Sequence, residues 1–117
     1  MNIIITRPLN DTENLMQDLF NLGHKIMHIP TLKISNVYLD PIEIKNFNAF
    51  IFTSSNAVRN LIVKGEKKNI KCFCVGSVTE KIARINGFTK TISASGNVNA
   101  LKNLIINSKE LKKNDKL

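Results

Sequence analysis

An apolar run that changes abruptly into hydroxyl and amide side chains constrains this chain more than any other feature. Residues 49–52 are apolar and partly aromatic, which is typical of a parallel strand covered on both faces. Ser54, Ser55 and Asn56 follow, and each is a favoured helix N-cap. Apolar residues then recur at helical spacing, at Ala57, Val58, Leu61 and Ile62. The stretch therefore predicts a strand, a polar turn and a helix.

A second segment repeats this design. Residues 70–76 predict another buried strand, and Ser77 with Glu80 three positions later forms a predicted capping box. Apolar residues at 82, 83 and 85 give the following helix its buried face. Gly76 allows a tight turn and a close approach of a ligand to the backbone.

Turns that follow neighbouring parallel strands lie at the same edge of a sheet, and open α/β folds bind ligands at this carboxyl edge. We therefore expect Ser54 and Thr79 to lie in one cleft, each near a helix N-terminus. Helix capping alone is the other explanation of these side chains. The candidate binding residues in the two turns are Thr53, Ser54, Ser55, Asn56, Gly76, Ser77 and Thr79.

The remaining segments continue the alternation of strands and helices. Residues 1–6 predict a first strand, Asn10 with Glu13 predicts a helix start, and residues 25–34 predict a second strand. The buried stripe expected for the first helix consists of Leu15, Met16, Leu19, Phe20 and Leu22. Residues 88–92 predict a short strand. The last helix is expected to be capped by Asn97 or Asn99 and to bury Ala100, Leu101, Leu104 and Ile105, with Leu111 extending the stripe.

Three of these segments together resemble the amino-terminal half of uroporphyrinogen-III synthase. They are Ile4-Ile-Thr-Arg-Pro8, Phe52-Thr-Ser-Ser-Asn-Ala-Val58 and Val75-Gly-Ser-Val-Thr79 followed by Gly87-Phe88. Each motif is weak alone, but their order and spacing match together. The resemblance implies an α/β fold of two flavodoxin-like lobes with parallel sheets, both incomplete in this chain. The expected division is a βαβ unit at 1–34, an interlobe linker at 35–48, βα units at 49–111 and a frayed tail at 112–117.

The resemblance also implies an activity, the cyclisation of hydroxymethylbilane to uroporphyrinogen III with loss of water and inversion of the last pyrrole ring. It implies no cofactor. The family's chains are much longer, so we expect a truncated form with little or no activity alone, and a second polypeptide supplying the missing half remains open. A noncatalytic α/β module that binds a phosphorylated or carboxylate ligand, or a partner chain, is the alternative function.

The family match favours Ser54, Asn56 and Thr79 as the first substrate-binding residues. Asn56 stands where some relatives have arginine, which puts a charge pairing there in doubt. Arg7 follows the first strand and could reach a carboxylate, although a surface ion pair is an equal alternative. The family's catalytic tyrosine belongs to the later half, so Tyr38 does not take its place and the catalytic groups are unassigned.

The charge and the remaining reactive residues limit the partners. The net charge is +8, but only three of the 17 basic residues are arginine. Because arginine dominates specific phosphate and base contacts, we expect an acidic small molecule rather than nucleic acid. Cys72 and Cys74 predict buried, reduced thiols, and these cysteines with His24 and His28 make a poor metal site. No segment has the length or leader pattern of a membrane or export signal, so we expect a cytoplasmic protein.

Overall fold

The computed structural model describes residues 1–108, 111, 112, 114, 115 and 117. The chain divides into two compact units, Met1–Val37 and Tyr38–Leu117. Residues 113 and 116 of the predicted tail, and residues 109 and 110 before it, lie outside the described residues.

The first unit is a βαβ unit. Strand β1 (Asn2–Ile5) pairs in parallel with β2 (Lys25–His28), and helix α1 (Glu13–Asn21) joins them after a 3₁₀ turn at Leu9–Asp11. The predicted second strand is too long, since β2 ends at His28. Beyond that end, Ile29 N and Thr31 N still donate to Ile5 O and Thr6 O at 2.8 and 3.0 Å.

Two further expectations for the first unit are wrong. The capping box of Asn10 and Glu13 does not form, because Asn10 lies inside the 3₁₀ turn and α1 begins after Thr12. Of the stripe expected to be buried on α1, Leu15, Phe20 and Leu22 are exposed, and Met16 and Leu19 are only partly buried. Two strands of four residues present too little surface to cover the whole apolar face of a helix.

The second unit contains a three-stranded parallel sheet in the order β4 (Ala49–Phe52), β6 (Lys71–Val75) and β7 (Lys90–Ala94). A separate parallel pair is formed by β3 (Ile42–Glu43) and β5 (Val63–Lys64), so part of the predicted linker is a strand here. Short 3₁₀ helices span Ile44–Asn46 and Lys67–Asn69. The predicted α/β class with parallel sheets is confirmed.

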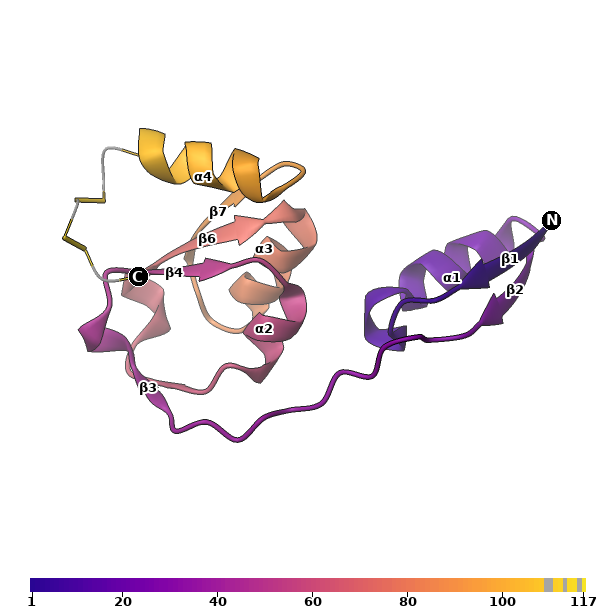
Figure 1. Ribbon diagram of the computed structural model, residues 1–117, viewed down its shortest axis with the longest axis horizontal. Helices are drawn as coiled ribbons and strands as arrows, with labels where there is room; N and C mark the ends of the chain where they lie inside the picture. The colour runs from indigo at the N-terminus through magenta and orange to yellow at the C-terminus, as the bar shows by residue number, and fades with distance from the viewer. Residues whose placement is uncertain (109–110, 113, 116) are drawn as a thin grey trace. The chain divides into compact units, whose positions relative to one another are not determined.

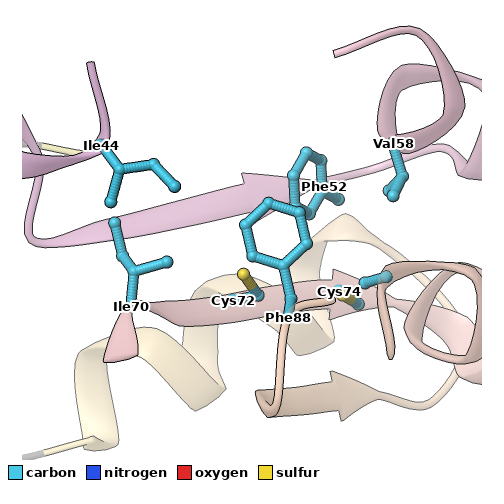
Figure 2. Packing of buried hydrophobic residues seen from close by; sticks show 8 residues of the cluster. Ile44, Phe52, Val58, Ile70, Cys72, Cys74 and Phe88 are labelled. Atoms are coloured by element: carbon cyan, nitrogen blue, oxygen red, sulfur yellow. The ribbon is translucent and has the colours of Figure 1, made fainter. Parts of the chain in front are cut away.

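Helices cover both faces of the three-stranded sheet (Figure 1). Helices α2 (Ser55–Asn60) and α3 (Gly76–Ile85) lie on one face, and α4 (Val98–Asn107) lies on the other. The alternation of side chains along β6 divides the core accordingly, because successive residues of a strand point to opposite faces. Cys72 and Cys74 pack with Phe52 and Phe88 (Figure 2), whereas Phe73 packs with Ala94 and Leu101.

Local differences from the expected elements have tertiary causes. Strand β7 begins two residues later than predicted, because Phe88 turns into the core with 1% of its surface exposed. Asn97 caps α4, since its side chain accepts from Ala100 N at 3.0 Å. Helix α4 ends at Asn107. Leu104, Ile105 and Leu111 all pack as expected, against the core cluster formed by Ala49, Phe73, Ala94 and Leu101.

Candidate functional site

Three polar turns lie together at the carboxyl edge of the sheet. In the pairing register Phe52 lies opposite Cys74, and Val75 lies opposite Ala94, so the three parallel strands end side by side. The first two turns are the predicted ones, after β4 and β6. The third turn, Ser95 to Asn97, lies between β7 and α4 and was not predicted as part of a site. Ser54 and Thr79 thus follow neighbouring strands at one edge.

The first turn joins β4 to α2. Ser54 is the N-cap, and its Oγ accepts from Asn56 N at 3.2 Å. Thr53 is exposed, while Ser55 is buried. Capping therefore accounts for the hydroxyl oxygen of Ser54, although a serine that accepts one hydrogen bond can still donate its own proton.

Arg59 is a member of this first turn that the sequence did not predict. Its Nη1 donates to Ser55 Oγ and to Asn56 Oδ1, both at 3.1 Å. Although Arg59 belongs to the last turn of α2, its guanidinium is folded back to the residues that begin the helix. The spacing of four between Ser55 and Arg59 was the available signal, because residues at i and i+4 are neighbours on a helix.

The second turn joins β6 to α3. Gly76 has φ +77°, a left-handed conformation that glycine adopts without strain. The predicted capping box of Ser77 and Glu80 is wrong, because α3 already begins at Gly76 and no side chain caps it. Ser77 and Val78 are exposed in the first turn. The backbone N–H groups that begin α3 are therefore not capped by a side chain.

Thr79 is buried as a residue, with 6% of its surface exposed. Among the described residues, none forms a hydrogen bond with its hydroxyl. Every fully buried side-chain oxygen or nitrogen in the described part of the chain has a partner, so the Thr79 hydroxyl must reach the solvent. It is therefore a polar group that the fold itself does not use.

The electrostatics of this edge favour an anion. Helix N-termini carry a partial positive charge and normally attract acidic residues. None of the first turns of α2, α3 and α4 contains one. The guanidinium of Arg59 adds a formal positive charge beside the first turn.

Glu80 lies one residue beyond Thr79, but its carboxylate faces β7. Glu80 Oε1 accepts from Thr91 Oγ1 at 3.0 Å and from Arg84 Nη2 at 2.8 Å, and Oε2 accepts from Ser93 Oγ. The hydrogen bond from Ser93, followed by that from Arg84, holds the pKa of Glu80 below its ordinary value. Glu80 is therefore ionised at neutral pH and is no proton donor.

The two cysteines are free thiols in the core, as expected. Both are fully buried, and burial raises the pKa of Cys72 to about 12 and that of Cys74 to about 11. A thiol in this environment stays protonated and is a weak nucleophile. Among the described residues, no group of three or more histidine, cysteine, aspartate or glutamate side chains could hold a metal ion.

Arg7 and Tyr38 lie outside these turns. Arg7, in the first unit, is largely exposed, and its Nη2 lies 4.0 Å from Asp11 Oδ2, a distance that fits the surface ion pair considered above. Its binding role stays a prediction. Tyr38 is 89% exposed. No helix in the described part of the chain is both long and apolar enough to cross a membrane.

The chain matches a known protein family. The family model of uroporphyrinogen-III synthase HemD matches residues 13–117, which include both predicted turns and the sheet that carries them. No curated protein matches the chain.

Proposed function

Because this chain belongs to the uroporphyrinogen-III synthase family, we propose that it takes part in the cyclisation of hydroxymethylbilane to uroporphyrinogen III. The reaction removes the hydroxymethyl oxygen as water, inverts the last pyrrole ring and joins the two ends of the tetrapyrrole. A flexible chain must be bent until its ends meet, so positioning supplies much of the rate. The substrate is a small molecule rich in carboxylates.

The observation that carries this proposal is the carboxyl edge with three polar turns and no acid in the first turn of α2, α3 or α4. Donors at helix N-termini hold carboxylates without a buried countercharge. In this proposal the second turn is the centre of the site. The N–H groups of Gly76 and Ser77 bind a substrate carboxylate, and the hydroxyl of Thr79 donates to it.

The first turn contributes through different atoms. Thr53 is exposed and can donate its hydroxyl directly, whereas Ser54 donates only its proton because its oxygen caps α2. Ser55 and Asn56 accept from Arg59 and so keep a positive charge at this edge. Arg59 thus supplies a positive charge near Asn56, the position at which some relatives have arginine. No catalytic acid or base is assigned.

The test is a coupled assay in which hydroxymethylbilane is generated enzymatically and the type III and type I isomers are separated. Ring closure without inversion gives type I, so type III product measures catalysis. We expect little type III formation by this chain alone; whatever type III product it forms should fall in Thr79→Val and stay unchanged in Thr31→Val, the same change at an exposed site in the first unit.

Direct binding separates the two proposed functions. Uroporphyrin III, the fluorescent oxidation product of uroporphyrinogen III, is titrated into the protein. Binding without type III formation would favour the noncatalytic carboxylate-binding module. A protein that neither binds the porphyrin nor forms type III product would refute the proposal.

A further inference from the structure

We propose that Glu80 is a positioning residue of this site, and that its carboxylate fixes α3 against β7 so that the first turn of α3 presents its donors correctly. The inference rests on the proposed function, since it assigns to Glu80 the orientation of Gly76, Ser77 and Thr79. Glu80 itself touches no substrate in this proposal.

The first support is the set of partners that Glu80 gathers. Thr91 and Ser93 are two residues apart on β7 and therefore point to the same face of the sheet, the face that α3 covers. Thr91 is only 8% exposed. One carboxylate thus holds two positions along a strand, one with each oxygen. These two attachment points restrain both the position of α3 along β7 and the rotation of α3 about its own axis.

The second support is the position of Glu80 along α3. It lies four residues after Gly76, which is about one helical turn, and directly after Thr79. No side chain caps the first turn, so this turn is not fixed from its own end. Ala83 and Ile82 of α3 pack into the hydrophobic core on the same face of the sheet. Apolar contacts have no direction, whereas hydrogen bonds do.

The third support is the neutralisation of a charge that would otherwise oppose the function. A carboxylate one turn away from an anion-binding turn repels the ligand by simple electrostatics. Here two hydroxyls and the Arg84 guanidinium all donate to it, and its oxygens face β7. The arrangement keeps the attachment and reduces the repulsion.

Electrostatics and positioning predict opposite effects of removing this side chain, and this makes the inference testable. If Glu80 acted only through its charge, Glu80→Ala would strengthen the binding of an anion. If Glu80 positions α3, the same change weakens binding. Glu80→Gln separates the two further, because Gln keeps an oxygen for Thr91 and Arg84 and an amide that can donate to Ser93.

The experiment titrates uroporphyrin III into the full chain and follows porphyrin fluorescence, at a temperature where far-UV circular dichroism shows each variant folded. We expect Glu80→Ala to raise the Kd about 10-fold or more, since a misplacement of about 1 Å can cost as much as 100-fold. Glu80→Gln should stay within about twofold of wild type. The matched control is Glu66→Ala, which removes an exposed glutamate bonded only to Asn69 among its described contacts.

The double variant Thr91→Val and Ser93→Ala keeps Glu80 and removes its partners on β7. It should weaken binding as Glu80→Ala does, and it serves as the test if Glu80→Ala does not fold. Folded variants of either kind that bind as tightly as wild type, or more tightly, would overturn this inference but not the proposed function. Equal loss in Glu80→Gln and Glu80→Ala would also overturn it. A wild-type protein that neither binds the porphyrin nor forms type III product would instead overturn the proposed function, and the inference with it.

Discussion

Phe88 should be the side chain on which the second unit depends most. Its ring is 1% exposed, and its centroid lies 5.5 Å from that of Phe52 and 5.8 Å from that of Phe50. Lys67 Nζ lies over the Phe88 ring, 5.4 Å from its centroid. Phe to Ala in a core costs about 3–5 kcal/mol, and each aromatic pair adds about 0.5–1.5 kcal/mol. We expect Phe88→Ala to lower the free energy of unfolding by about 4 kcal/mol or more.

Urea unfolding followed by circular dichroism measures this change. With a slope of about 2 kcal/mol per molar urea, the midpoint should fall by about 2 M. The matched control is Phe20→Ala, the same substitution at a residue that is 67% exposed on α1, which should change stability by no more than about 0.5 kcal/mol. Phe88→Leu should recover part of the loss. A midpoint for Phe88→Ala no lower than that for Phe20→Ala would show that the packing in Figure 2 does not stabilise the protein.

Three further predictions concern the charge of Glu80, the two thiols and the segment that follows β2. The lowered pKa of Glu80 means that its contribution is present above its ordinary pKa of 4.5 and is lost as pH falls through the lowered value. At neutral pH the free energy of unfolding of wild type should therefore exceed that of Glu80→Gln by about 1 kcal/mol. Urea midpoints of the two proteins that do not converge on acidification would contradict this. Cys72 and Cys74 should resist a thiol-specific disulfide reagent at about pH 8 until urea unfolds the chain, whereas rapid labelling of the native protein would show that they are accessible. Among residues 1–107, trypsin should cut first after Lys33, which is exposed and lies outside any helix or strand. If Lys33→Gln gives the same early fragments as wild type, this site is excluded.

The parallel α/β organisation could be predicted because it depends on runs of residues rather than on single contacts. Strands covered on both faces must be apolar at successive positions, and residues 49–52 and 72–75 are. The helices that follow show apolar residues at helical spacing for the same reason. Asn97 was also predictable, since an N-cap bonds to a backbone group three residues away and needs no distant partner.

Glu80 could not be placed in this way. A serine followed three residues later by glutamate has the form of a capping box, in which both partners are local. In the structure the carboxylate takes Thr91 and Ser93 instead, residues that come next to it only when β7 pairs with β6. The four hydrogen bonds from the two hydroxyls and Arg84 outcompete the single backbone N–H that the box offers. Local pattern cannot decide between these partners.

The predicted burial of the apolar stripe of α1 is wrong for a related reason. Amphipathic spacing shows that a helix has an apolar face, but the area that covers this face belongs to other segments. Ile4 and Met27, paired across β1 and β2, are exposed as well. Spacing within one element therefore predicted the element correctly and its burial incorrectly.

The three helix N-termini at the carboxyl edge differ in how their first N–H groups are satisfied, and this difference points to α3. Ser54 accepts from Asn56 N in α2, and Asn97 accepts from Ala100 N in α4, so a ligand at either helix must compete with a cap. No side chain caps α3. An uncapped helix start is less stable by about 1 kcal/mol, and a bound carboxylate would restore that interaction. Under the proposed function, the missing cap, the unused hydroxyl of Thr79 and the attachment of Glu80 share one explanation, which is that this turn is kept in place and left open for a ligand.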